Sequence, residues 1–161
     1  PLCGAPTIAV GTIEGGDEIN IVPEHCMIKV DRRTIPGEDS GEVLQRFKER
    51  LEDLAARHGL RCSVEELLLD WALNTSPDSP IVQCARQVSR ELGLPCEVRG
   101  VPYGSDASKL QHYKGIPSIV YGPGSIAQAH SQQEWVPVQD VGRAAEFYLQ
   151  LARRFGRASI Q

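Results

Sequence analysis

Residues 115–136 read G-I-P-S-I-V-Y-G-P-G-S-I-A-Q-A-H-S-Q-Q-E-W-V, a stretch that joins an apolar run to a glycine-rich loop. The run Ile116–Tyr121 is rich in β-branched residues and bounded by glycine, which is typical of a strand buried on both faces of a parallel sheet. In open α/β sheets, ligands bind beyond the carboxyl ends of the strands. We therefore expect the loop after Tyr121, which contains His130 and Glu134, to carry function.

His130 is a candidate metal ligand. Neutral imidazole is the commonest metal ligand in proteins, and a nearby carboxylate such as Glu134 can fix its tautomer. The alternative is a solvated loop histidine that binds nothing. Zinc needs three or four ligands and a catalytic site also needs a base, so partners for His130 must come from other parts of the protein.

The composition is that of an ordinary soluble globular protein. Of the 161 residues, 41% are hydrophobic and 24% are charged, and this length suffices for one domain or two small ones. A net charge of -4 without a basic patch argues against nucleic acid as a partner, and no apolar run is long enough to span a bilayer. Five cysteines without a C-x-x-C pair favour reduced thiols in the cytoplasm. Because the chain begins at Pro1 without methionine, we expect it to be a piece of a longer protein.

Periodicity, caps and turn residues predict the order of the elements. Strands are expected at 7–13, 24–33, 61–71, 96–101 and 116–121. Helices are expected at 39–58, 80–92, 106–113 and 138–155, with linker composition at 74–80. The segment 61–71 also contains a Glu-Glu-Leu-Leu-Leu run that fits a helix. Strand, strand, helix and strand make most of a ferredoxin-like sandwich, and the later alternation of helices with strands predicts a parallel α/β sheet.

Gly104 and Ser105 lie between an expected strand end and an expected helix start. Backbone N–H groups and the Ser105 hydroxyl can cradle a carboxylate at such a positive helix terminus. The alternative is that Ser105 or Asp106 is only an N-cap. Asn20, in the same way, suits a turn through its tolerance of left-handed geometry.

Four motifs together resemble the zinc-dependent amidohydrolase and metallopeptidase family of acetylornithine deacetylase, succinyl-diaminopimelate desuccinylase, aminoacylase and glutamate carboxypeptidase. They are G-G-D-E-I-N-I-V-P at 15–23, D-R-R-T-I-P-G-E at 31–38, Y-G-S-D-A-S-K-L at 103–110 and the stretch 115–136. The resemblance implies an α/β fold. A partial ferredoxin-like α+β lid domain at 1–74 would precede the C-terminal part of an α/β zinc-peptidase-like catalytic domain at 75–161.

The resemblance also implies a role for each matching residue. His130 matches the last metal ligand of the family, and Glu134 matches a carboxylate behind the ligands. Arg33 matches an arginine that pairs with a substrate carboxylate, and its neighbour Arg32 is a rival pointing the other way on an ideal strand. The other residues expected in the substrate cleft are Asn20, Gly104 and Ser105.

The family hydrolyses an amide with two zinc ions and a glutamate general base, and the resemblance leaves cobalt or manganese open as alternatives to zinc in this protein. Its H-x-D motif and Glu-Glu pair are not matched in this chain, so the general base is expected elsewhere. The resemblance implies the C-terminal portion of a hydrolase of N-acyl amino acids such as acetylornithine or succinyl-diaminopimelate, inactive alone and homodimeric through the lid. The alternatives are a non-catalytic dimerisation or binding module, and a metallocarboxypeptidase of the same family.

Overall fold

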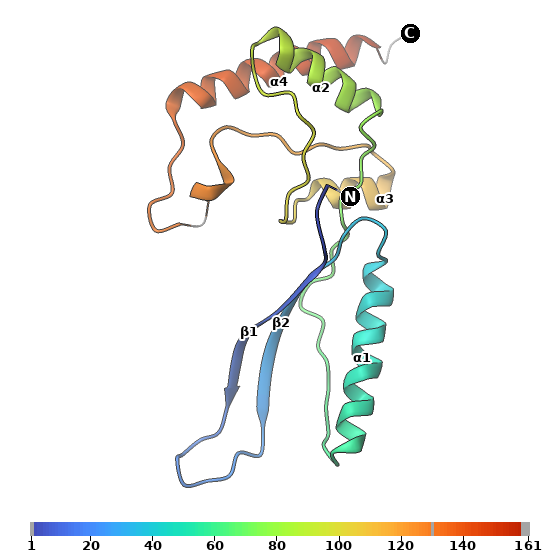
Figure 1. The fold of residues 1–161 in the computed structure, drawn as a ribbon, viewed down its shortest axis with the longest axis vertical. Helices are drawn as coiled ribbons and strands as arrows, with labels where there is room; N and C mark the ends of the chain where they lie inside the picture. The colour runs from blue at the N-terminus through green and yellow to red at the C-terminus, as the bar shows by residue number, and fades with distance from the viewer. Residues whose placement is uncertain (1, 130, 159–161) are drawn as a thin grey trace. The chain divides into compact units, whose positions relative to one another are not determined.

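A computed structural model describes residues 2–129 and 131–158 (Figure 1). The chain divides into two compact units. Unit 1 comprises Pro1–Ala72 with Gly100–Gly104, and unit 2 comprises Leu73–Arg99 with Ser105–Gln161. The elements are β1 Thr7–Gly15, β2 Cys26–Arg33, α1 Ser40–Arg57, α2 Pro80–Glu91, α3 Ala107–Lys114, the 3₁₀ turn η1 Ile126–Gln128, and α4 Val138–Ala158. None of the helices in the described ranges is long and apolar enough to cross a bilayer.

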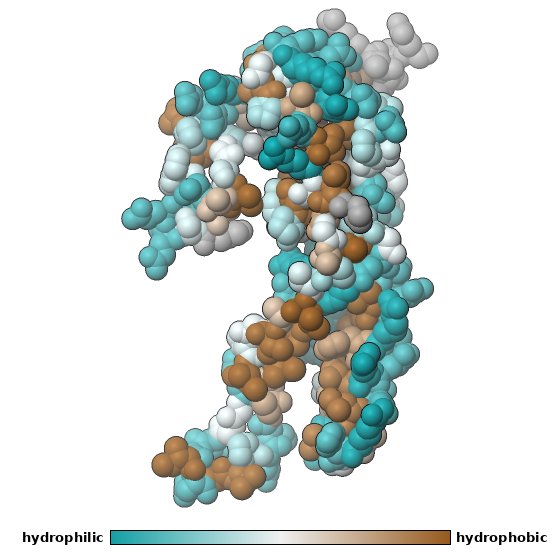
Figure 2. Space-filling model, viewed as in Figure 1, coloured by the Kyte–Doolittle hydropathy of each residue, from teal (hydrophilic) through white to brown (hydrophobic). Residues whose placement is uncertain are grey.

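Unit 1 is built on an antiparallel hairpin of β1 and β2 with a bulge at Gly11. Val10 pairs with Val30, whereas Ile13 pairs with Ile28, so β1 uses one residue more than β2 over the same length. The additional residue keeps Ile13 on the same face as Val10. This face is apolar, and Figure 2 shows apolar side chains gathered along the hairpin.

Helix α1 follows β2 and confirms the helix predicted at 39–58. Asp39 is the N-cap, and its Oδ1 accepts a hydrogen bond from the Glu42 N–H at 2.9 Å. The helix ends at His58, and Gly59 follows with a φ of 64°. The segment 61–71 then returns along α1 to its start, where the Ser40 hydroxyl donates to the Asp70 carbonyl at 2.6 Å (Figure 1).

The core of unit 2 lies between α2 and α4. Phe147 is fully buried, and it clusters with Val88 and Ala85 of α2. Its ring stacks on Tyr121 with centroids 3.7 Å apart, and the Tyr148 hydroxyl donates to the Tyr121 carbonyl. The predicted helices 80–92 and 138–155 are thus confirmed, and their apolar faces meet.

The stretch 116–121 differs from its prediction in one respect. Within the described residues it pairs with no strand, because no neighbouring strand offers it a ladder. Ile119 and Tyr121 nevertheless pack against the core, whereas Ile116 and Val120 are about half exposed. The segment therefore has the alternation of a strand that is covered on one face, not on both.

The strands predicted at 61–71 and 96–101 do not form either. In the described part of the chain, the sheet contains β1 and β2 and no parallel pair. Period-2 patterns report the surroundings of side chains, but a strand also needs an adjacent strand to accept and donate its backbone hydrogen bonds. These segments run as single extended stretches for the same reason as 116–121.

The segment 74–80 has the composition of a linker, but hydrogen bonds fix its first two residues to other parts of unit 2. The Thr75 hydroxyl donates to the Ser118 carbonyl at 2.5 Å and accepts from the Ser118 N–H at 3.2 Å. Gln111 on α3 exchanges two hydrogen bonds with the Asn74 backbone, at 2.7 and 3.2 Å. Residues 74–75 are therefore fixed to both α3 and the stretch 116–121.

Candidate functional site

The candidate site residues fall into both units. Asn20, Arg33 and Gly104 belong to unit 1, and Ser105 and Glu134 belong to unit 2. His130, the predicted metal ligand, lies outside the described residues.

The two adjacent arginines of β2 have different surroundings. Arg32 Nη2 donates to Glu38 Oε1 at 2.6 Å, its Nη1 donates to the Arg33 carbonyl, and its side chain is 28% exposed. Arg33 Nε donates to Asp31 Oδ2 at 2.8 Å, and its side chain is 53% exposed. Arg32 is thus occupied by the protein, which favours Arg33 as the arginine available to a ligand.

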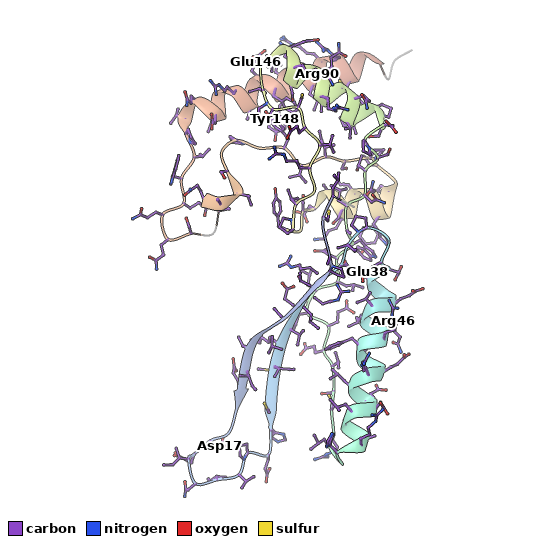
Figure 3. The ribbon with its side chains drawn as sticks, in the orientation of Figure 1. Asp17, Glu38, Arg46, Arg90, Glu146 and Tyr148 are labelled. Carbon is purple, nitrogen blue, oxygen red and sulfur yellow. The ribbon has the colours of Figure 1, made fainter. Side chains whose placement is uncertain are left out.

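Glu38 closes the loop between β2 and α1, where Figure 3 labels it. Its Oε2 accepts the Ile35 N–H at 3.0 Å while Oε1 accepts from Arg32. The Ile35 hydrogen bond, followed by that from Arg32, lowers the pKa of the Glu38 carboxyl, because both stabilise the charged form. The residue therefore keeps a negative charge opposite Arg32 at neutral pH.

Arg33 and Gly104 are brought together within unit 1. A Cβ built on Gly104 would lie 3.9 Å from Arg33 Nη1, which is ordinary van der Waals contact. A longer side chain at position 104 would reach the guanidinium. Gly100, four residues earlier, lies against the N-terminal segment, since a Cβ built on it would come within 2.4 Å of the Leu2 carbonyl.

Asn20 lies in a turn at the tip of the hairpin. The Ile21 N–H donates to the Glu18 carbonyl at 3.2 Å, which makes Asn20 a central residue of this turn. Arg33 lies at the opposite end of β2, and this strand alone spans about 23 Å at the rise of about 3.3 Å per residue. Within one chain, the structure does not bring Asn20 and Arg33 together.

Ser105 serves the first turn of α3. Its hydroxyl accepts the Ala107 N–H at 3.3 Å, and its carbonyl accepts from the Ser108 N–H and hydroxyl. Asp106 occupies the N-cap position without a side-chain capping bond and pairs instead with Lys109 Nζ at 3.0 Å. The local geometry thus contains the capping interaction that the sequence offered as the alternative to a substrate cradle.

The described residues do not form a metal centre. No three histidine, cysteine, aspartate or glutamate side chains among them gather closely enough to hold an ion. Glu134 is exposed in the loop between η1 and α4, and the five cysteines are all free. The residues present therefore do not fit a metal by themselves, and any ligand role of His130 requires partners beyond them.

Comparisons with known proteins agree with the motifs. Residues 2–59 match the M20-type peptidase dimerisation domain. The acetylornithine deacetylase of Myxococcus xanthus is 30% identical over 138 residues, which cover 85% of this chain and 35% of that protein. The acetylornithine deacetylase of Photorhabdus laumondii is 31% identical over 151 residues, covering 93% of this chain and 37% of that protein.

Solved structures show the same fold. An M20 family metallo-carboxypeptidase from Sulfolobus solfataricus has a TM-score of 0.73 at 19% identity, covering 93% of this chain and 36% of that one. The aminopeptidase PepT from Bacillus cereus has a TM-score of 0.73 at 25% identity, covering 92% and 39%. The chain therefore has the α/β fold of M20-type peptidase structures, and residues 2–59 resemble their dimerisation domain. It is similar to the acetylornithine deacetylases and spans a little over a third of their length.

Sequence reasoning missed the carboxylate partners of the two arginines. Asp31 precedes Arg33 by two residues on a strand, a spacing that places opposite charges on one face. That spacing could have indicated the pair. Glu38 follows Arg32 by six residues across a Pro-Gly turn, and no spacing rule predicts such a contact.

Proposed function

We propose that this chain forms the lid and the C-terminal part of the catalytic domain of a metal-dependent hydrolase that cleaves the amide bond of N-acyl amino acids. Residues 1–74 would be the lid and dimerisation domain, and residues 75–161 would belong to the catalytic domain. The substrates would be of the acetylornithine or succinyl-diaminopimelate type. The matches to two acetylornithine deacetylases support this substrate class.

The observation that carries the proposal is the contrast between Arg32 and Arg33. An N-acyl amino acid has a free carboxylate, and a guanidinium is the side chain that best binds it, through two parallel hydrogen bonds. Arg33 is half exposed with its Nη1 beside Gly104, whereas Arg32 is held by Glu38. Arg33 would bind the substrate carboxylate beside Gly104, and Ser105 would also take part in substrate binding. Asn20, which lies far from Arg33 within one chain, would reach a substrate from the partner subunit of a homodimer.

His130 would supply one ligand to a zinc ion, with Glu134 behind it, and the remaining ligands and general base would come from outside this chain. Bound zinc would activate water for attack on the acyl carbonyl. The 161-residue chain alone would then bind no zinc tightly. Equilibrium dialysis with elemental analysis, beside His130→Ala, tests this point, and tight zinc lost in the variant would show instead that the chain assembles a complete site.

The unit that contains the dimerisation domain also leaves much apolar surface uncovered. Exposed apolar residues on its hairpin are Ile8, Val10, Ile13, Met27 and Ile28. We propose a homodimer formed through residues 1–74, since an uncovered hairpin edge and face favour association. A cytoplasmic location is proposed on the five free cysteines.

Activity distinguishes the candidate functions. The complete natural polypeptide that contains these 161 residues would be supplied with zinc and assayed on N-acetylornithine, N-succinyl-diaminopimelate and short peptides. Release of ornithine or diaminopimelate, strongly reduced in Arg33→Ala, is the expected result. Release of C-terminal amino acids from peptides alone would favour a carboxypeptidase, the activity after which the Sulfolobus solfataricus neighbour is named. Dimerisation without hydrolysis would favour a non-catalytic dimerisation module, the second reading that the matched domain allows.

A further inference from the structure

Asp31 and Arg33 form an ion pair on one face of β2. Residues two apart on a strand share a face, and Arg33 Nε donates to Asp31 Oδ2 at 2.8 Å. The side chains are 53% and 57% exposed, so the pair stands open to solvent. Arg32, on the other face, is held separately by Glu38.

The pair leaves the outer edge of the Arg33 guanidinium available. Asp31 engages only Nε, and among described residues neither Nη1 nor Nη2 of Arg33 donates to an acceptor in the protein. These two nitrogens form the edge that binds a carboxylate through parallel hydrogen bonds. Arg32 differs, because both of its Nη groups already donate to Glu38 and to a backbone carbonyl.

The residues around this edge leave room for a ligand. Across the hairpin, Asp31 pairs with Ala9 and Arg33 pairs with Thr7, both of which are small. Gly104 lies beside Nη1 and carries no side chain. Within unit 1, the guanidinium is thus held at Nε by Asp31, its side chain is 53% exposed, and the neighbours named above are small.

We infer that Asp31 is a positioning residue for substrate recognition: its carboxylate holds Arg33 at Nε so that Nη1 and Nη2 face the substrate carboxylate. This inference rests on the proposed function, since it takes Arg33 as the carboxylate-binding residue. An arginine has many rotamers, and fixing it before the substrate arrives reduces the entropy lost on binding.

Position and charge make opposite predictions for this residue. As a negative charge beside Arg33, Asp31 weakens the attraction of the guanidinium for an anion, so its removal would tighten binding if charge alone mattered. If Asp31 instead acts by holding Nε of Arg33, its removal weakens binding of the substrate carboxylate. Asparagine separates the two effects, because its side-chain oxygen still accepts from Nε–H but carries no charge.

The experiment compares N-acetylornithine with its carboxamide analogue as substrates of the complete natural polypeptide. Asp31→Ala should raise KM for the carboxylate substrate about fivefold to tenfold, as expected when one long side chain must be ordered on binding. Its kcat and its KM for the carboxamide should not change. Asp31→Asn should retain the low KM. Glu38→Gln, which alters the partner of Arg32 instead, is the matched control and should leave the ratio of the two KM values unchanged.

Three outcomes would overturn the inference. A lower KM in both Asp31 variants would assign the residue a purely electrostatic effect. A raised KM in Arg33→Ala together with an unchanged KM in Asp31→Ala would remove the positioning role and leave the proposed function intact. Absence of hydrolysis by the wild type would overturn the proposed function and the inference together. NMR of the Arg33 Nε–H group adds a readout independent of turnover: its resonance should shift in Asp31→Ala and stay in Glu38→Gln.

Discussion

Truncating Phe147 should cost unit 2 a large part of its stability. Phe147 and Val88 are the largest fully buried side chains among the described residues, and the Phe147 ring stacks on Tyr121 at 3.7 Å with planes 18° apart. A second ring, that of Tyr148, meets it edge-on with centroids 5.8 Å apart. Among the described side chains of α4, Phe147 is the large one that is fully buried in the core.

The size of the effect follows from burial and stacking. Roughly 200 Å² of buried ring at about 25 cal/mol per Å² gives an upper value near 5 kcal/mol. Truncation of buried phenylalanine to alanine typically costs about 3–5 kcal/mol, within which an aromatic pair contributes about 0.5–1.5 kcal/mol. We expect Phe147→Ala to lower the free energy of unfolding by about 4 kcal/mol, and Phe147→Leu by about 1–2 kcal/mol, since leucine keeps the apolar volume but loses the stack.

Urea denaturation of the 161-residue chain, followed by circular dichroism at 222 nm, measures these differences. The matched control is Leu149→Ala, two residues further along the same helix, because Leu149 is 44% exposed. It should cost less than about 1 kcal/mol. Equal costs at positions 147 and 149 would refute the packing of α4 on α2 and Tyr121.

Three further experiments test other features of the fold. Asp39→Ala removes the N-cap of α1 and should cost about 1 kcal/mol in urea denaturation, and an unchanged midpoint would show that the cap is dispensable. The hydrogen bond from Arg154 lowers the pKa of the Glu91 carboxyl, so this ion pair stabilises the fold above about pH 4.3 and stops doing so as pH falls through the lowered pKa. The difference in unfolding free energy between the wild type and Glu91→Gln should therefore vanish in acid. A constant difference from about pH 6 to about pH 3 would contradict this. Burial raises the pKa of the Cys84 thiol, so iodoacetamide should label Cys84 several times more slowly than the exposed Cys26, as peptide mass spectrometry would report, and equal rates would count against that burial.

The helices of this protein could be predicted from its sequence, because their signals are local. Asp39 and Gly59 mark the ends of α1 through side-chain capping and a left-handed backbone, and both lie where the sequence placed them. Ser79 shows the limit of such signals. It immediately precedes the predicted helix 80–92 and is a residue type that favours the N-cap position, yet its hydroxyl makes no capping bond and finds no acceptor or donor in the described residues.

The strands could be predicted only in part, because pairing is not local. The hairpin formed where two suitable segments were joined by a turn, whereas 116–121 has the right alternation and no adjacent strand. The candidate site shows the same limit. The order of the motifs identified Arg33 and Asn20 as site residues, although the strand predicted at 24–33 already separates them by its own length.

Unit 1 is discontinuous in sequence, since residues 100–104 belong to it and Gly100 lies close to the backbone of Leu2. During synthesis, that unit cannot close until position 104 has left the ribosome. By then all of α2 has been made, but its packing partner α4 begins only at Val138. The apolar face of α2 therefore stays uncovered while about 50 further residues are synthesised. At typical rates of about 5–20 residues per second, this is an interval of a few seconds in which α2 is exposed to chaperones and to other nascent chains.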